Sequence, residues 1–200
     1  VEVLEPRTTL ADLQALNERG LASGWSIGEL NAQRSRLSRI KGGQLAEYFA
    51  SRPARALFIS DVPGDDPAVI GSGLMGPGPA PDAVRRSVIA SIDHAVAAAR
   101  TAAQARGLEV WADTKRFADD AERLGVRFVH ELHMNLAPVR IWGGESVVRL
   151  PSNPGRGGRN QQLALAAARV MAGHEDLLLL CAGTDGTDGP TEDAGALVDG

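Results

Sequence analysis

Three glycines between residues 155 and 158 lead directly into an apolar stretch that is typical of a helix. Glycines let a backbone turn sharply and let a ligand approach its N–H groups, and a helix start adds unpaired N–H donors with a partial positive charge. Arg156 and Arg159 bring two cations to the same place. This combination indicates an anion site, most simply one for phosphate, although a flexible surface hairpin would use the same glycines.

Two aspartates lie in a second glycine-rich loop further along the chain. Residues 177–182 form a very apolar run that reads as a buried strand, and the loop behind it carries Asp185 and Asp188. A phosphate cradle beside paired carboxylates suggests phosphoryl transfer assisted by Mg²⁺, which needs only one or two carboxylates besides phosphate and water. Ordinary turn chemistry remains the alternative, because Asp-Gly is a common turn pair.

The first part of the chain contains a similar pattern. Residues 54–60 read as a buried strand that is followed at once by Asp61, which is the best candidate there for a functional carboxylate. Asp66, further along the loop, is more simply a cap for a short helix. Lys41 lies in a basic loop with two glycines. It is either a surface lysine or a contact for a phosphate or carboxylate, and its neighbours alone do not decide between them.

Glu145 and the histidines carry weaker signals. Glu145 follows two glycines at the end of a predicted strand, so a hairpin turn and a contact to substrate or metal-bound water are both open. His130 and His133 are one residue too close for the zinc motif HExxH. We therefore expect solvated or structural histidines and no zinc site.

Helices and strands alternate along the chain, which predicts an α/β layered fold with a largely parallel sheet. Capping boxes at Thr9 with Asp12 and at Ser26 with Glu29 mark two helix starts. Helices are expected at residues 10–23, 27–37, 44–50, 93–106, 115–124 and 160–172. Strands are expected at residues 54–60, 88–91, 108–112, 138–142, 146–150 and 177–182. Both aspartate loops follow strands, where ligands bind in such sheets.

The composition is that of an ordinary globular chain. Its 200 residues are 44% apolar and 23% charged, and the formal net charge of −4 argues against a general nucleic-acid binder. No apolar stretch reaches the roughly 18 residues of a membrane helix. The single cysteine, Cys181, reads as a small buried residue in a reducing, cytoplasmic setting. Because the chain opens at a valine and stops just after an apparent helix start, we expect a piece of a longer protein.

Together these segments resemble the glycerate 2-kinase family, whose members have a C-terminal MOFRL domain and are often labelled hydroxypyruvate reductase. The resemblance is carried by five motifs in the family's order, at residues 37–46, 60–73, 143–145, 155–161 and 182–191. The chain departs from the family pattern after Gly73, where the family usually has proline and a longer segment. Residues could therefore be missing between Gly76 and Ser87. The family's N-terminal portion is also absent.

The resemblance implies a kinase that uses ATP and Mg²⁺ to phosphorylate the 2-hydroxyl of D-glycerate, and two α/β domains with the site in a cleft between them. Residues 1–137 would belong to an N-terminal Rossmann-like α/β domain and residues 138–200 to a MOFRL-type α/β domain, each incomplete. No nucleic acid or membrane partner is implied, and a homodimer is left open.

Site residues are carried over motif by motif. The implied catalytic residues are Lys41, Asp61 and Arg159, and the implied metal ligands are Asp185 and Asp188. The implied cofactor-binding residues are Gly143, Gly144, Glu145, Gly157, Gly158 and Asn160. Two other functions stay open. One is a nicotinamide-dependent hydroxypyruvate reductase, for which no GxGxxG that directly follows a strand and has an acid about 20 residues later is visible. The other is a non-catalytic phosphometabolite-binding protein.

Overall fold

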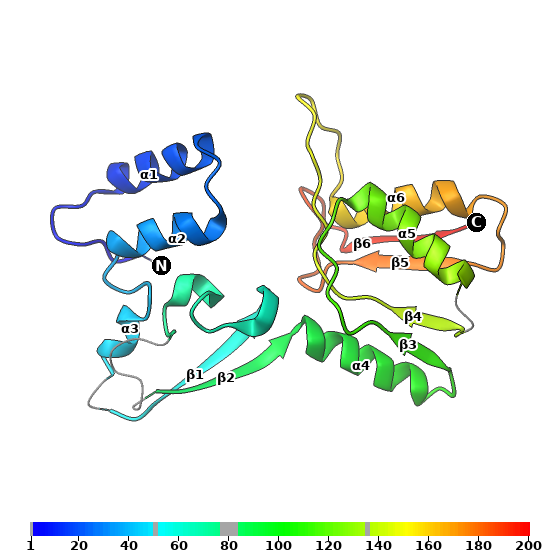
Figure 1. The fold of residues 1–200 in the computed structure, drawn as a ribbon, viewed down its shortest axis with the longest axis horizontal. Coiled ribbons are helices and arrows are strands. Elements are labelled where there is room, and N and C mark those ends of the chain that lie inside the picture. Colours follow the sequence, from blue (N-terminus) through cyan, green and yellow to red (C-terminus); the bar gives the residue numbers. More distant parts are fainter. Residues whose placement is uncertain (1, 50–51, 77–83, 135–136) are drawn as a thin grey trace. The chain divides into compact units, whose positions relative to one another are not determined.

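The computed structural model describes residues 2–49, 52–76, 84–134 and 137–200. It divides into two compact units, Val1–His94 and Ala95–Gly200, each of which combines helices with a parallel strand pair (Figure 1). This confirms the α/β class. The predicted domain boundary after residue 137 falls inside the second unit and stays a prediction. The stretch between Gly76 and Ser87, where we expected a departure from the family, is described only in part, because residues 77–83 lie outside the described ranges.

Two helices open the first unit, and both start at the predicted capping boxes. Helix α1 (Leu10–Ala22) begins after Thr9, and α2 (Ile27–Arg36) begins after Ser26. At the first of these, the Thr9 hydroxyl accepts from the Asp12 N–H at 3.2 Å, and the Asp12 carboxylate accepts from the Thr9 N–H at 2.8 Å. Reciprocal bonds of this kind satisfy N–H groups that a helix start leaves unpaired, so these boundaries follow from local sequence.

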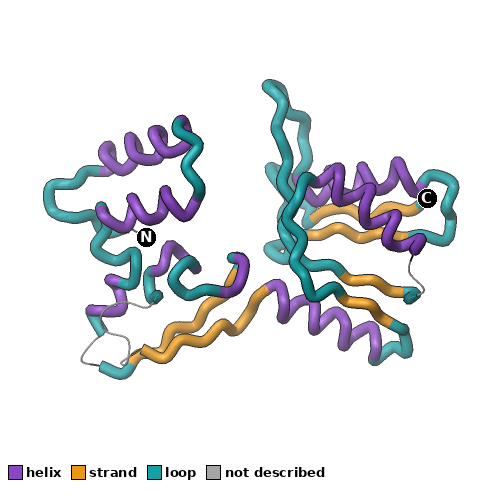
Figure 2. Tube along the Cα trace, in the orientation of Figure 1, coloured by secondary structure: helices purple, strands orange, loops and turns teal. Residues whose placement is uncertain are grey.

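A parallel pair of strands forms the sheet of the first unit. Strands β1 (Ala54–Ser60) and β2 (Val84–Ser91) run side by side (Figure 2). Strand β1 lies where it was predicted, and β2 starts four residues before the predicted brief strand. The short helix α3 (Gln44–Glu47) and two 3-10 turns, η1 (Pro63–Asp65) and η2 (Ile70–Gly73), complete this unit. Side chains on β1 alternate, with Ala56 and Phe58 in the core and Leu57 and Ile59 exposed, as one covered sheet face requires.

The second unit contains two strand pairs and three helices in its described residues. Helix α4 (Ile92–Gln104) runs across the division between the units. It is followed by β3 (Val110–Ala112), α5 (Ala121–Met134) and β4 (Val139–Ile141), and β3 pairs with β4 in parallel. Helix α6 (Arg159–Met171) and the antiparallel strands β5 (Leu178–Ala182) and β6 (Gly195–Asp199) follow. The core of the unit lies where α5, α6 and β5 meet, around Leu124, Val129, Leu163, Met171 and Leu179.

Three predicted elements in this unit are wrong. The helix expected at residues 115–124 is replaced by α5, which starts only at Ala121. Helix α5 also continues through Gly125, where we expected a helix to end. A side-chain carbon at position 125 would lie 2.5 Å from the Leu163 carbonyl oxygen and 2.9 Å from the Ala167 nitrogen, so the glycine lets α5 and α6 approach. Residues 146–150 form only an isolated bridge rather than a strand, and the expected helix start near the last residues is strand β6.

Within the described ranges, the helices are too short or too polar to cross a lipid bilayer.

Candidate functional site

In the first unit, the loop that carries Lys41 packs against the loop that follows β1. Gly42 N–H donates to the Ser72 carbonyl at 3.1 Å, and Gly43 N–H donates to the Gly73 carbonyl at 2.6 Å. Ser72 has a φ of +60° and Gly73 a φ of +69°, a region that serine rarely adopts. Two of the sequence motifs therefore meet through backbone contacts at a strained turn, which is typical of functional loops. We call this arrangement the Lys41 contact.

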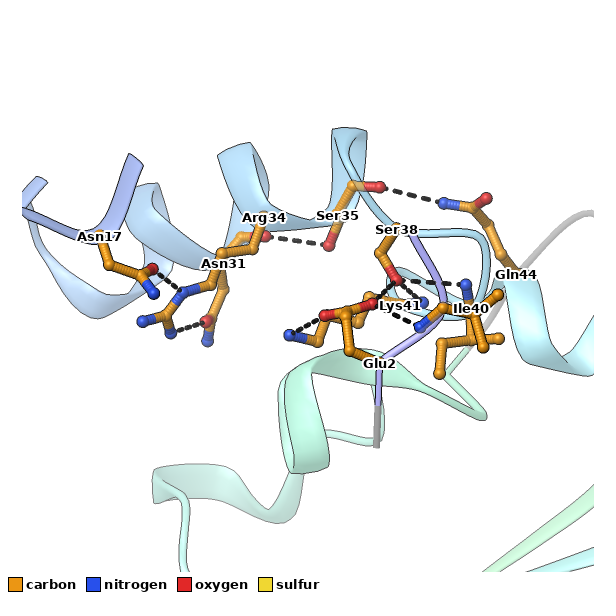
Figure 3. A network of polar contacts seen from close by, with 10 residues as sticks. Glu2, Asn17, Asn31, Arg34, Ser35, Ser38, Ile40, Lys41 and Gln44 are labelled. Carbon is orange, nitrogen blue, oxygen red and sulfur yellow. Dashed lines mark hydrogen bonds and ion pairs between the residues drawn. The ribbon is translucent and has the colours of Figure 1, made fainter. Parts of the chain in front are cut away.

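The side chain of Lys41 is held by a small polar network (Figure 3). Its Nζ lies 2.7 Å from Glu2 Oε2, and the buried Ser38 hydroxyl donates to Glu2 Oε1 at 2.6 Å. The same hydroxyl oxygen accepts from the N–H groups of Ile40 at 3.2 Å and Lys41 at 3.1 Å. One hydroxyl thus uses its donor and both lone pairs, and it fixes the loop and its ion pair together.

Glu2 is the anion of this network. Partial burial tends to raise the pKa of its carboxyl group, but the hydrogen bonds and charge of Lys41, together with the Ser38 hydroxyl and the Val3 N–H, outweigh burial and hold the pKa below its usual value. Glu2 therefore stays ionised beside Lys41 near neutral pH. Sequence reasoning missed Glu2, because nothing in its own neighbourhood connects it with a loop almost forty residues later.

Asp61 and Asp66 lie in the loop behind β1. Asp61 is exposed directly after the strand, where it was predicted. In the described part of the chain no hydrogen bond or ion pair joins it to Lys41. Asp66 Oδ1 accepts from the Ala68 N–H at 2.9 Å, so Asp66 caps a turn and not the short helix that we expected.

In the second unit, the two predicted glycine loops lie against each other. Asp188 is only 2% exposed, and a side-chain carbon at Gly158 would overlap its carboxyl group. A side-chain carbon at Gly189, which has a φ of +60°, would overlap the backbone of Gly157. The glycines at these positions permit the close approach of two backbones. We call this arrangement the Asp188 contact.

The Asp188 carboxylate caps helix α6. Its Oδ1 accepts from the Asn160 N–H at 3.0 Å and the Asn160 side-chain amide at 3.2 Å, and its Oδ2 accepts from the Gln161 N–H at 2.7 Å. The N-cap residue, Gly158, has no side chain to do this. The carboxylate thus sits at the positive end of the helix dipole and takes two of the N–H groups that we assigned to a phosphate.

The Asp188 contact affects the prediction that Asp185 and Asp188 both bind a metal ion. Two donors already point at Asp188 Oδ1 and one at Oδ2, and the group is shielded from water. Asp185 is exposed, with the Thr187 N–H at 3.5 Å from its Oδ1. Within the described ranges no three His, Cys, Asp or Glu side chains converge on one metal position. The assignment of both aspartates as metal ligands stays a prediction.

Arg159 and Glu145 are brought together from two motifs. They form an ion pair in which the side chain of Arg159 is 47% exposed and that of Glu145 is 60% exposed. The glycines before Glu145 have a structural use: Phe117 N–H donates to the Gly143 carbonyl at 3.0 Å, and a side-chain carbon at Gly144 would overlap the Phe117 backbone. Their role in binding a cofactor stays a prediction.

Cys181 lies in β5 and is buried, as expected. Burial, with a smaller contribution from the negative charge of Asp188, raises the pKa of its thiol to about 12. The thiolate is the reactive form, so Cys181 acts as a small apolar residue.

Comparison with known proteins now places the chain. Residues 1–105 match the domain of unknown function DUF4147, and residues 138–200 match the MOFRL family. The chain belongs to the glycerate 2-kinase family of DUF4147 and MOFRL proteins. This family chain is 34% identical to a D-glycerate 2-kinase of Thermotoga maritima, with 96% of the chain and 55% of the relative covered. It is 36% identical to a putative hydroxypyruvate reductase of Agrobacterium vitis, with 95% and 60% covered.

Solved structures agree with this placement. The glycerate kinase of Thermotoga maritima superposes with a TM-score of 0.88 at 32% identity, and a protein of Pyrococcus horikoshii superposes with 0.80 at 28%. Both cover all of this chain, which spans 57% and 56% of theirs. The chain thus spans little more than half the length of these relatives. The sequence match to the Thermotoga kinase runs over 232 positions, more than the 200 residues here, so that relative has internal segments that this chain lacks.

Proposed function

We propose that this chain is part of a kinase that uses ATP and Mg²⁺ to phosphorylate the 2-hydroxyl of D-glycerate. The observation that carries the proposal is the match to proteins named glycerate 2-kinase over 96% of the chain. That match spans the two loop contacts, each of which brings separate motifs together around a charged side chain. A cytoplasmic location and a homodimer remain expectations.

The way in which each charged residue is held supports the role that we propose for it. Kinase catalysis is mostly positioning and stabilisation of phosphoryl charge. Lys41 is partly buried and is paired with one carboxylate, so an anionic substrate group could share or replace that partner. Arg159 is half-exposed and suits a transferring phosphoryl group. Asp61, exposed after β1, would orient the glycerate hydroxyl and accept its proton.

For the metal, the contacts favour Asp185 over Asp188. Mg²⁺ keeps several waters and needs carboxylate oxygens that are open to solvent. Asp185 meets this requirement, whereas Asp188 is buried and bonded to the start of α6. We therefore propose Asp185 as the Mg²⁺ ligand of the pair and Asp188 as the residue that orders α6. Bound Mg²⁺ would neutralise charge on the nucleotide phosphates.

The test is a kinase assay on the complete protein with D-glycerate, ATP and Mg²⁺. We expect ADP release and a product that ³¹P NMR identifies as 2-phosphoglycerate rather than 3-phosphoglycerate. No ADP release with glycerate or related hydroxy acids would overturn the proposal.

The name of the Agrobacterium vitis relative makes reductase activity a second candidate. It is tested in parallel by following NADH and NADPH oxidation with hydroxypyruvate. We expect none, since the GxGxxG letters at residues 71–76 fall in η2 and the turn after it, separated from the end of β1 by residues 61–70, and not at a direct junction of strand and helix. Oxidation at a rate that rises with enzyme concentration would favour the reductase.

A further inference from the structure

Two histidines meet in the second unit, at the opposite end of α6 from Asp188. His133 lies in the last turn of α5, and His174 lies in the turn between α6 and β5. His133 Nε2 is 3.3 Å from His174 Nδ1, and the ring planes are inclined by 74° with centroids 4.4 Å apart. We expected solvated or structural histidines and no zinc site, and nothing in the sequence indicated that the fold pairs two of them.

The backbone on both sides of this pair is fixed. His133 follows Val129 by one helical turn, and Val129 is completely buried in the core of the unit. His174 N–H donates to the Met171 carbonyl at 2.8 Å, and its own carbonyl accepts from the Leu177 N–H at 3.1 Å. Met171 is also completely buried. The two imidazoles are thus carried by anchored segments rather than by loose loops.

One further bond sets the proton on His133. Its Nδ1 lies 2.9 Å from the Val129 carbonyl oxygen, which can only accept, so Nδ1 carries the hydrogen. Nε2 of the neutral ring then has a free lone pair, and this lone pair faces Nδ1 of His174. A histidine that donates one ring N–H to a backbone carbonyl and offers the other nitrogen is the usual arrangement of a metal ligand.

The spacing of the two nitrogens fits a metal as well. Two Zn–N bonds of about 2.0–2.1 Å at a tetrahedral angle put the nitrogens about 3.3–3.4 Å apart. We propose that His133 Nε2 and His174 Nδ1 form a two-histidine site for a borderline divalent transition metal such as Cu²⁺ or Zn²⁺. His174 would bind as its Nε2–H tautomer, so both ligands are neutral, and water would fill the open positions. Imidazole prefers this class of metal to Mg²⁺.

A metal there would link the end of α5 to the α6–β5 turn. The two ligands are 41 residues apart in the chain, so the link would close a long loop and stabilise the folded unit. Because this site uses neither the aspartates nor the arginines of the candidate active site, it stands or falls independently of the proposed kinase activity.

The test is Cu²⁺ binding to the full chain, measured by equilibrium dialysis and by electron paramagnetic resonance. We expect one tight Cu²⁺ per chain with hyperfine coupling to two imidazole nitrogens. His133→Gln and His174→Gln should each weaken binding at least tenfold and leave one coupled nitrogen. His130→Gln is the matched control, since His130 is an exposed histidine on the same helix, and it should leave binding unchanged.

A second measurement uses stability. Zn²⁺ should raise the melting temperature of the wild-type chain and of His130→Gln, but not of the other two variants. Both histidines are exposed, so these substitutions should leave the fold intact, which circular dichroism checks. Wild-type affinity in either His133→Gln or His174→Gln, or equal loss in His130→Gln, would overturn the proposal.

Discussion

The Lys41 contact and the Asp188 contact are built alike but hold their charges differently. Each joins two glycine loops through close backbone approach. Lys41 is paired with a single carboxylate and keeps 16% of its side chain exposed, whereas Asp188 is 2% exposed and receives two backbone N–H groups and an amide. A side-chain partner can be exchanged for a ligand, but helix N–H groups cannot move away. We expect this difference to separate a charge that is available for chemistry, Lys41, from one that maintains the fold, Asp188.

The largest expected effect is on catalysis, and it concerns Arg159, the exposed charge beside the Asp188 contact in sequence. Arg159→Ala should lower kcat by about 100-fold with little change in melting temperature, because a lost transition-state contact costs about 3 kcal/mol while an exposed ion pair contributes about 0–1 kcal/mol. Steady-state kinetics of the complete enzyme measures this. Arg169→Ala, in the last turn of the same helix, is the control. Turnover within about tenfold of wild type would remove Arg159 from the mechanism.

The next prediction concerns the contribution of Asp188 to the stability of the folded chain. Asp188→Ala should lower the free energy of unfolding by about 2–3 kcal/mol, because it leaves two helix N–H groups and an amide without their charged acceptor. Asp185→Ala, an exposed aspartate three residues away, should change it by about 0.5 kcal/mol or less. Urea unfolding compares them. Equal losses, or a stable Asp188→Ala chain, would break the distinction between the two contacts.

The backbone of the Lys41 contact is tested by Gly73→Ala. The added carbon would lie 2.5 Å from the Ala68 carbonyl oxygen at a φ of +69°, so strain and overlap together should cost about 1–3 kcal/mol. Gly64→Ala has a similar φ of +79° with no atom within 4 Å, so it measures the strain alone. Urea unfolding of both variants gives the difference. If they lose equal stability, the close approach at Gly73 is unimportant.

The smallest effect concerns the partner of Lys41. Glu2→Gln should lower stability at pH 7 by less than about 1 kcal/mol, because water still reaches the pair. The pKa of Glu2 is lower in the folded chain than its ordinary value of 4.5, so this stabilisation is present above pH 4.5. It should disappear as the pH falls through the lower folded-state pKa. Unfolding curves of wild type and variant between pH 3 and 7 should converge at the acid end, and a constant gap would contradict this origin.

Some elements could be predicted because their causes are local. The capping boxes at Thr9 and Ser26 act within one turn, and β1 is an apolar run with sharp ends. Helix α6 begins within one residue of its predicted start. Gly125 was misread because its neighbours in sequence look like a helix end, while its actual neighbour is the backbone of α6.

The features of the candidate site also fall into those that the sequence predicted and those that it did not. The motifs around Lys41, Asp61 and Asp185 were visible as charges beside glycines or after a strand. The contacts of Glu2 and the capping role of Asp188 were not, because they depend on which distant backbone lies opposite each side chain.

The sequence alone was enough for the family, the α/β class and the helix starts after Thr9 and Ser26, since these follow from motifs and from interactions that span a few residues. Which charges and rings meet depends on the three-dimensional packing: Asp188 meets a helix start 28 residues earlier, and His133 meets a histidine 41 residues later. The physical reason is the short reach of a hydrogen bond, about 3 Å. A change of one residue in the position of a helix moves a side chain further than that.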